Sequence, residues 1–306
     1  MDRRHHIPVL LRDSLLLLSP LEGKTFADLT LGEGGHTDAL LEGGAAKVFA
    51  MDRDSEAIRD YQQMGRFFHD PRLCLIHDNF SNLQAYVSPS SLDGVIADLG
   101  VSTYQILHPN RGFSFQFSAP LDMRMNANDE SLESILQRMS LEDLADWLKK
   151  NTGIKRGKEF AYKILTAFRE GKLKNTLDLA NLFSKQNKKR VHPATVVFLG
   201  LRMMVNQELA AIETGFQAAL ECLKPGGRLV VITFHSSEDR YVKRSLLLTA
   251  GKCVCGGPPP ICRCPKKKMT NIVLKHPITP TREDIRRNPR SRSAKLRCVE
   301  KLAVQG

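Results

Sequence analysis

Two aspartates and a glycine-rich segment have the residue types and the spacing of a nucleotide-binding site. The glycines lie in Asp28-Leu-Thr-Leu-Gly-Glu-Gly-Gly-His36, where a predicted strand ends and a helix begins, and glycine lets the backbone approach a ligand there. Asp52 ends the next predicted strand, where an acid can accept both hydroxyls of an adenosine ribose. Asp98 ends a further strand, which in a doubly wound sheet faces the bound ligand. The pattern predicts a nucleotide site at these strand ends.

Two cofactors fit this arrangement, and the details favour one of them. The dinucleotide fingerprint G-x-G-x-x-G requires a third glycine, but Thr37 stands at that position. Glu33 and the net charge of −6 over residues 1–105 are unfavourable for a pyrophosphate and suit the cationic sulfonium of S-adenosylmethionine. We therefore expect S-adenosylmethionine rather than NAD, with Asp98 placed for chemistry or for the cofactor's methionine end. The simpler alternatives are a plain strand–helix turn and a solvated aspartate.

Short apolar runs alternate with helical patterns in the first third of the chain and return near its end, which predicts a doubly wound, mostly parallel α/β sheet. The predicted strands are Thr25–Leu31, Lys47–Asp52, Leu73–His77, Gly94–Leu99, Gly227–Phe234, Asn271–Lys275 and Lys295–Val299. The residues between the fourth and fifth strands show only helical patterns, including a helix that opens at Pro193 and runs to about Leu209. We expect one sheet domain, residues 1–105 and 206–306, interrupted by an inserted all-helical domain, residues 106–205.

The charge of the chain separates along the same boundaries. The net charge is +12, but residues 106–205 carry +7 and residues 263–306 carry +10. Such a basic surplus indicates a polyanionic partner such as nucleic acid, although a solvated basic surface is the simpler alternative. We expect the acidic part to hold the cofactor and the two basic parts to hold the polyanion.

The sequence predicts a cytoplasmic protein without a membrane partner. No uncharged apolar run reaches about 18 residues, the length that a spanning helix needs. Arg12 and Asp13 interrupt the apolar stretch near the N-terminus, and no small-residue cleavage site follows it, so a signal peptide is not expected. The seven cysteines, an odd number in a chain of 306 residues, do not form the framework of a small disulfide-rich secreted protein.

Eight short sequence strings, spread in a fixed order along nearly the whole chain, resemble those of a known protein family. They are His6-Ile-Pro-Val-Leu-Leu, Asp28 to His36, Asp98-Leu-Gly-Val-Ser, Arg111-Gly-Phe-Ser-Phe, Pro120-Leu-Asp-Met-Arg-Met125, His192-Pro-Ala-Thr, Phe234-His-Ser-Ser-Glu-Asp-Arg240 and Asn288 to Arg297. With these strings the sequence resembles the ribosomal RNA small subunit methyltransferase H family, bacterial enzymes that methylate N4 of a cytidine in 16S rRNA. It departs from the family pattern at Thr103 and Tyr104, and it is unusually basic over residues 152–159.

The resemblance implies a fold, a reaction and a set of site residues. The fold is the Rossmann-like one of class I S-adenosylmethionine-dependent methyltransferases, and the target is cytidine 1402 in the usual bacterial numbering, at the decoding centre of the small ribosomal subunit. The residues implied to contact S-adenosylmethionine are Gly34, Gly35, His36, Asp52, Phe80, Asp98 and Gln105.

Cytosine N4 is a poor nucleophile because its lone pair is delocalised into the ring, so methylation needs positioning and an acceptor for an N4 proton. Asp98, or the backbone carbonyls of Leu99–Val101, is the predicted acceptor. His235 is a second candidate beside it, although the residues from His235 to Asp239 equally suit a helix cap. C5 methylation would need a cysteine thiolate after a strand, and no cysteine has that place.

An aromatic and basic segment and a run of lysines are candidate RNA contacts. Phe113 and Phe115 lie between Arg111 and Arg124, and aromatic rings can receive an unstacked base, although packing of the inserted domain is an equal alternative. The lysine run Lys266, Lys267 and Lys268 is a candidate phosphate contact, with a solvated face as the alternative.

Four of the seven cysteines stand within twelve residues, as Cys253-Val-Cys255 and Cys262-Arg-Cys264. Four thiols so close in sequence suggest a structural tetrahedral Zn²⁺ site, although the C-x-C spacing is tighter than the usual C-x₂₋₄-C. A reduced, proline-rich surface loop is the alternative.

Three other functions fit part of the pattern. A methyltransferase of the same fold could act on DNA or on a protein, a non-catalytic RNA-binding assembly factor could retain the cofactor loop, and an oxidoreductase could use NAD. The acids at the predicted strand ends argue against a factor that has lost catalysis.

Overall fold

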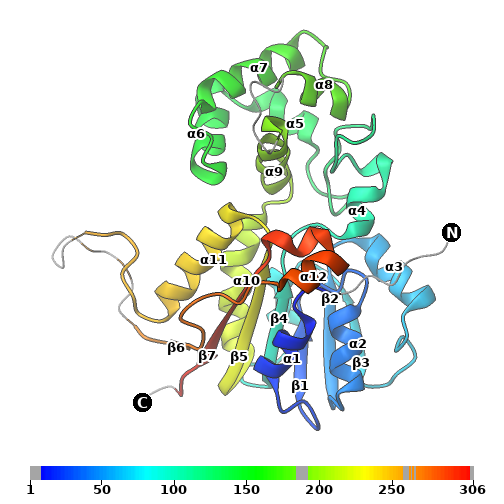
Figure 1. The fold of residues 1–306 in the computed structure, drawn as a ribbon, viewed down its shortest axis with the longest axis vertical. Helices are drawn as coiled ribbons and strands as arrows, with labels where there is room; N and C mark the ends of the chain where they lie inside the picture. The colour runs from blue at the N-terminus through cyan, green and yellow to red at the C-terminus, as the bar shows by residue number, and fades with distance from the viewer. Residues whose placement is uncertain (1–7, 184–191, 258–261, 263, 265–266, 304–306) are drawn as a thin grey trace. The chain divides into compact units, whose positions relative to one another are not determined.

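The computed structural model describes residues 8–183, 192–257, 262, 264 and 267–303. Its chain contacts divide it into two compact units (Figure 1). Met1–Gly100 and Leu209–Gly306 form one unit, here called the sheet unit, and Val101–Glu208 form the other, here called the helical unit. His6 and Ile7, which open the first of the resembling strings, lie outside the described residues.

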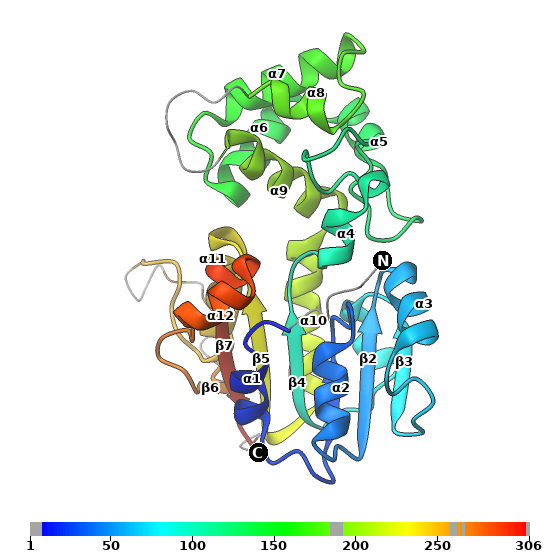
Figure 2. The ribbon, with the colours of Figure 1, turned by 45° about the vertical axis from the view of Figure 1, so that its right-hand side comes forward.

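The sheet unit is built on seven strands in the order β3-β2-β1-β4-β5-β7-β6 (Figure 2). The strands are β1 (Thr25–Asp28), β2 (Lys47–Asp52), β3 (Leu73–His77), β4 (Leu92–Asp98), β5 (Leu223–Thr233), β6 (Thr270–Ile272) and β7 (Lys295–Lys301). The pairs among β1 to β5 are parallel, and β7 is antiparallel to both of its neighbours. The predicted doubly wound, mostly parallel sheet is therefore confirmed.

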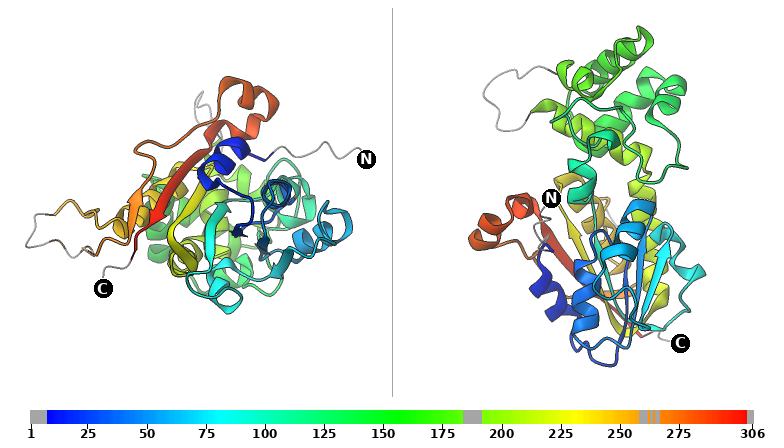
Figure 3. Two further views of the ribbon diagram at one scale, coloured as in Figure 1. Left: turned by 90° about the horizontal axis from the view of Figure 1, so that it is seen from below. Right: turned by 90° about the vertical axis from the view of Figure 1, so that its right-hand side faces the viewer.

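Helices cover both faces of this sheet (Figure 3), because alternate strand residues are apolar on both sides. The helices of the sheet unit are α1 (Leu11–Leu18), α2 (Gly35–Glu42), α3 (Ser55–Met64), α10 (Glu208–Cys222), α11 (Ser236–Thr249) and α12 (Arg282–Arg287), with 3₁₀ turns η1 (Phe80–Ala85) and η3 (Pro289–Ser293). In β4, Val95 and Ala97 pack with α10 and α11, whereas Ile96 packs with α1 and α2. Two buried cores thus hold the strands rigidly in place.

Several predicted boundaries were wrong for local reasons. The strand at Thr25 ends at Asp28, three residues early, because the chain turns into the glycine segment. The KPGG segment lies inside β5, where Gly226 has a φ of 80° and the pairing with β4 is irregular. The helix that opens at Pro193 ends at Val205, and α10 begins at Glu208, because Gln207 adopts a φ of 47° between them.

The helical unit has its own core and, over its described residues, no strand beyond one bridge between Pro120 and Asn175. Its helices are α4 (Thr103–Leu107), α5 (Leu132–Arg138), α6 (Leu141–Thr152), α7 (Gly157–Arg169), α8 (Thr176–Asn181) and α9 (Pro193–Val205), with the 3₁₀ turn η2 (Pro109–Arg111). Buried Asn206 connects the end of α9 to the segment before α5: its Oδ1 accepts from the Met125 amide at 2.7 Å, and its Nδ2 donates to the Met123 carbonyl at 2.7 Å.

Among the described residues, no single helix has the length and apolar character needed to cross a membrane, whereas α9 and α10, bent by 55°, pass that test only as a pair. Each of these two helices buries apolar side chains in the core of its own unit.

Candidate active site

The parallel strands bring acidic side chains to one edge of the sheet unit. Asp28 ends β1, Asp52 ends β2 and Asp98 ends β4. Asp28 pairs with Ala50 and with Ile96, so Asp52 and Asp98 lie two residues further along their strands at the same edge. In open α/β sheets ligands bind at this carboxyl edge. The three aspartates therefore share the edge at which the sequence predicts a nucleotide site.

Asp52 anchors the glycine segment to β2. Its Oδ2 accepts from the Gly32 amide at 2.9 Å, and its Oδ1 accepts from the Asp54 amide at 2.9 Å. Burial raises the pKa of Asp52 to about 6, and these two hydrogen bonds oppose that rise only in part. The carboxylate is thus held rigidly, with lone pairs left for a ligand, at the strand end where a ribose is expected.

Asp28 is a further buried acid, which we did not predict as a site residue although it opens the glycine segment. It is 1% exposed, and it accepts from the Thr37 hydroxyl at 2.8 Å and from the Thr30 amide at 3.1 Å. Burial, and to a smaller extent the charge of Asp52, raise the pKa of Asp28 to about 6. Its place at the end of the strand was the available signal.

The burial of the Asp98 carboxylate is not fully offset by hydrogen bonds. Its Oδ2 lies 4.0 Å from Nδ1 of the buried His36, at the first turn of α2, and its amide donates to the Thr30 hydroxyl at 2.7 Å. Its Oδ1 is buried and has no hydrogen-bond partner among the described residues. Burial, followed by the negative charges of Asp28 and Glu238, raises the pKa of Asp98 well above its usual value. A buried acceptor in such a place suits a donor or a cation supplied by a ligand.

The glycines of the segment serve two different purposes. A Cβ at Gly34, where φ is 83°, would lie 2.1 Å from the Tyr61 ring, and one at Gly35 would lie 2.1 Å from Pro8. Packing inside the sheet unit therefore explains why both lack side chains. A Cβ at Gly32 would meet nothing closer than the Thr30 carbonyl at 3.9 Å, so Gly32, which we did not predict, is the glycine open to a ligand.

Phe80 and His235 follow the ends of β3 and β5. Phe80 opens η1 and is partly buried in the sheet core, where a Cβ on Gly215 of α10 would lie 2.3 Å from its ring. His235 precedes α11, and the buried carboxylate of Glu238 accepts from the amides of Phe234 at 3.1 Å and His235 at 3.2 Å. Glu238 therefore caps the start of α11, which is the alternative to a base-pocket role for this segment. Its negative charge also raises the pKa of Asp98.

The polar residues of the helical unit that we predicted as site residues form hydrogen bonds within that unit. Gln105 lies in α4, and its Oε1 accepts from the Ser102 amide at 3.0 Å in a reciprocal helix cap. The Arg111 guanidinium donates to the carbonyl of residue Arg124 at 3.1 Å, and the Arg124 guanidinium donates to Asp122 at 3.0 Å and to the Ala127 carbonyl at 2.8 Å.

Phe113 and Phe115 pack against the core of the helical unit. The Phe115 ring lies 5.0 Å from that of Phe198 and 5.3 Å from that of His192, as packed aromatic pairs do. Both rings thus pack within the helical unit, as in the alternative to base binding that the sequence leaves open.

The basic C-terminal region is divided between exposed and paired side chains. Lys267 and Lys268 are exposed, whereas Lys266 lies outside the described residues. Arg297 and Lys295 on β7 instead bind the carboxylate of Asp239, at 2.7 Å and 2.9 Å, and hold the pKa of Asp239 below its usual value. These two basic residues therefore attach α11 to the sheet.

The four clustered cysteines lie in the connection between α11 and β6. The Sγ atoms of Cys253, Cys255, Cys262 and Cys264 all lie within 4.8 Å of one another, and none forms a disulfide.

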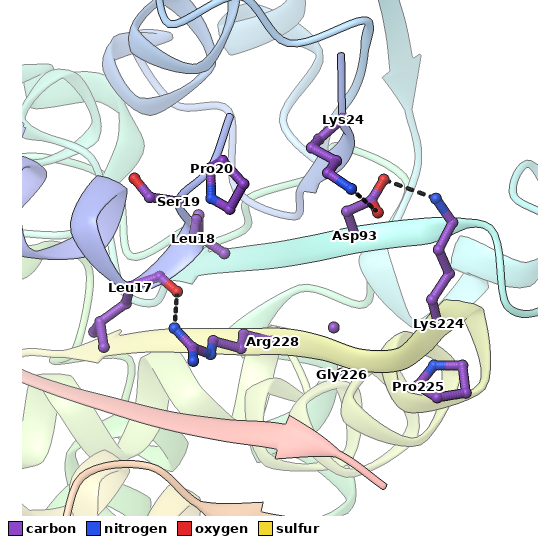
Figure 4. A pocket seen from close by; sticks show the side chains of 11 residues that line it. Leu17, Leu18, Ser19, Pro20, Lys24, Asp93, Lys224, Pro225, Gly226 and Arg228 are labelled. Carbon is purple, nitrogen blue, oxygen red and sulfur yellow. Dashed lines mark hydrogen bonds and ion pairs between the residues drawn. The ribbon is translucent and has the colours of Figure 1, made fainter. Parts of the chain in front are cut away.

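A separate pocket lies at the opposite edge of the sheet, at the start of β4 and β5 (Figure 4). Asp93 there binds Lys224 at 2.8 Å and Lys24 at 3.6 Å, and Arg228 donates to the Leu17 carbonyl at 2.9 Å. Asp28, Asp52 and Asp98 are absent from its lining, so it is no candidate for the cofactor.

Comparison with known proteins decides the family. The model of the MraW methylase family matches residues 3–302. This chain belongs to the MraW methylase family. A relative from Thermomicrobium roseum named ribosomal RNA small subunit methyltransferase H is 39% identical, over 98% of this chain and 95% of the relative. One of the same name from Rhizobium etli is 42% identical, over 95% of this chain and 86% of the relative.

Among solved structures, a putative methyltransferase from Streptococcus mutans in complex with SAH has a TM-score of 0.43 and 15% identity, covering 97% of this chain and 100% of that one.

The chain has a doubly wound, mostly parallel sheet, and as a member of the MraW methylase family it takes S-adenosylmethionine as its methyl donor. The residues at the carboxyl edge fit that group. Asp52 has a fixed carboxylate, Gly32 leaves open space, and the acids near Asp98 favour a positive charge. Both expectations, the fold and the cofactor, are confirmed.

Proposed function

We propose that this chain methylates N4 of a cytidine in 16S rRNA, at position 1402 in the usual bacterial numbering, within the small ribosomal subunit. Membership of the MraW methylase family and the name that its relatives carry, ribosomal RNA small subunit methyltransferase H, support small-subunit rRNA as the substrate. The observation that carries the chemistry is the buried Asp98 Oδ1, which has no hydrogen-bond partner among the described residues.

The cofactor is assigned to the sheet unit. Asp52 accepts the ribose hydroxyls and Gly32 leaves room for the nucleotide. The sequence resemblance adds Gly34, Gly35, His36, Phe80 and Asp98 of the sheet unit as cofactor contacts. S-adenosylmethionine supplies an electrophilic methyl group on a sulfonium. A cation bound beside Asp98 lowers the pKa of that residue and keeps its carboxylate ionised, because opposite charges stabilise one another most where water is excluded.

Asp98 then acts on the target base. Its Oδ1 would accept one of the two N4 protons as the N4–methyl bond forms and the methyl–sulfur bond of the donor breaks, which would orient the amino group and prevent positive charge from building up on nitrogen. The backbone amide of Asp98 is fixed by the Thr30 hydroxyl, so the carboxylate starts from a rigid strand end. His235 follows β5, the strand paired with β4, and stays a secondary candidate.

The arrangement of thiols favours a nitrogen target over ring carbon. C5 methylation requires a thiolate that adds to the base, and none of the seven cysteines lies at the carboxyl end of β4. Cys74 and Cys298 lie within strands, Cys222 ends α10 before β5 begins, and the other four are in the α11–β6 connection.

RNA binding is assigned to the helical insertion, which we propose spans residues 106–205, and to the exposed lysines Lys267 and Lys268. Arg111, Phe113, Phe115 and Arg124 already contact their own unit, so in this proposal they shape the RNA-binding surface, and the lysines carry phosphate contacts. We place the reaction in the cytoplasm.

The test compares the unmodified chain, Asp98→Ala and the control Glu42→Gln, an exposed acid at the other end of α2. Each is incubated with S-adenosylmethionine and either naked 16S rRNA or small subunits, and the modified nucleotide is mapped by mass spectrometry. We expect methyl on cytidine N4, lost in Asp98→Ala, which keeps RNA binding, and retained in the control.

Four outcomes would contradict the proposal. Methyl on C5 or on no cytidine refutes the reaction, and transfer only to DNA or protein refutes the substrate. RNA binding without turnover by the unmodified chain would instead indicate an assembly factor, and an NAD titration with saturable binding would indicate an oxidoreductase.

A further inference from the structure

The connection between α11 and β6 carries four cysteines near the surface. It joins Thr249 to Thr270, and its base is closed by a 3.0 Å hydrogen bond between the hydroxyls of these two threonines and by a bridge from Ala250 to Lys268. Cys253 and Cys255 within it are exposed, and Cys262 and Cys264 are only partly buried. Cysteine is usually among the most buried residues, so four thiols gathered near the surface need another explanation than packing.

The sulfur positions match those around one tetrahedral ion. With a Zn–S bond of about 2.3 Å, tetrahedral geometry places the four sulfurs about 3.8 Å apart. The Sγ of Cys253 lies 3.4 Å from that of Cys255 and 3.4 Å from that of Cys262, and all four Sγ atoms lie within 4.8 Å of one another. A disulfide would instead bring two sulfurs to about 2.05 Å.

The charge of the surrounding sequence favours thiolates. Residues 252–268 contain five basic side chains and no acid. Four thiolates around a divalent ion carry a net charge of −2, and nearby lysine and arginine side chains stabilise thiolates and offset that charge.

We propose that Cys253, Cys255, Cys262 and Cys264 bind one structural Zn²⁺ ion that closes the α11–β6 connection. Binding replaces four S–H bonds by four Zn–S bonds and releases four protons to solvent, with no change of oxidation state. All four positions of the ion are filled by sulfur, so the site is structural rather than catalytic. Zinc is favoured over an iron–sulfur cluster because the sulfurs converge on one point, whereas cluster thiolates bind separate irons.

The experiment measures metal content and loop protection in the full chain, purified without added chelator. Elemental analysis is expected to find about one zinc per chain in the unmodified protein and in the control Cys74→Ser, whose thiol lies on β3 outside the cluster. The double variant Cys253→Ser/Cys255→Ser is expected to lose that zinc. Co²⁺ exchanged into the unmodified protein should give the visible absorption of a tetrahedral tetrathiolate, absent from the double variant.

Limited trypsin digestion gives a second measurement that does not depend on methyl transfer. Zinc removal by a chelator is expected to speed cleavage within residues 252–268 at least several-fold, and added Zn²⁺ should restore protection in the unmodified chain but not in Cys262→Ser. Thermal unfolding of the rest of the protein shows whether each variant folds.

The proposal is overturned if the purified protein stays metal-free when Zn²⁺ is supplied, if it contains iron, or if the four thiols are found as two disulfides. Zinc retained at full stoichiometry by the folded double variant also overturns it, since the ion would then be bound elsewhere.

Discussion

The substitution Asp52→Asn separates cofactor binding from folding, because it changes a charge and almost no volume. Raising the pKa of Asp52 from 3.8 to about 6 means that the ionised carboxylate costs the folded, ligand-free protein about 3 kcal/mol above pH 6. Asparagine removes that cost but turns an NH₂ group toward either the Gly32 or the Asp54 amide, and losing that acceptor costs about 1–3 kcal/mol. The two effects oppose each other, so we expect the free energy of unfolding to change by less than roughly 2 kcal/mol.

Cofactor affinity should change much more than stability. A ribose hydroxyl that donates to a carboxylate contributes about 1.5–3 kcal/mol, so Asp52→Asn is expected to raise the dissociation constant roughly 10- to 150-fold. The pKa of Asp52 is 3.8 in the unfolded chain and about 6 in the folded protein. Below about pH 6 the Asp52 carboxyl of the folded protein is therefore mostly protonated and neutral. The affinity of the unmodified protein for S-adenosylmethionine should therefore fall as the pH drops through 6, and more shallowly in the variant.

Isothermal titration with S-adenosylmethionine at pH 5 to 8, together with urea unfolding, checks both expectations. Glu42→Gln, which also removes one negative charge from the sheet unit, is the matched control and should bind normally. An affinity for Asp52→Asn within twofold of the control at pH 8, with folding intact, would refute the assignment of Asp52 to the ribose.

Three further variants test the packing and charge assignments. Gly34→Ala places a methyl group 2.1 Å from the Tyr61 ring at a φ of 83°, so urea unfolding should show a loss of at least about 2 kcal/mol; a loss below 0.5 would contradict the close packing. Asn206→Ala leaves two buried backbone groups without partners and is expected to cost about 2–4 kcal/mol, whereas an unchanged urea midpoint would show that water replaces them. Replacing Lys267 and Lys268 by alanine should reduce the dependence of RNA affinity on the logarithm of salt concentration by a slope of about 1–2, and an unchanged slope would exclude phosphate contacts there.

The sheet and the place of the site were predictable because both depend on local patterns. A strand of a doubly wound sheet is apolar on both faces, so a short apolar run such as Gly94–Leu99 can be recognised as a strand from the sequence. The carboxyl ends of such strands then give the positions of Asp52 and Asp98. The interruption of the helix after Val205 was not predictable, since the positive φ at Gln207 has no marker such as glycine or proline.

The roles of individual side chains depended on contacts between distant residues. The sequence resemblance implies that Gly34 and Gly35 contact the cofactor, and only the structure shows that Tyr61 and Pro8 occupy the space that side chains there would need. Arg111 and Arg124 are candidate RNA contacts by their sequence position, and only the structure shows that their guanidinium groups bind carbonyls and a carboxylate of their own unit. Side-chain pairing of this kind is set by packing, which no spacing rule encodes.

The sequence by itself determined the alternation of strands and helices, the separation of acidic and basic segments, the family motifs and the four-cysteine cluster, because each is a property of residue order. Only the tertiary structure decided that Asp28 is buried beside Asp52 and Asp98, and that Asp98 Oδ1 has no partner among the described residues. The physical reason is that the cost of a buried charge depends on every group around it, and those groups come from β1, β4 and α11, which are far apart in the chain.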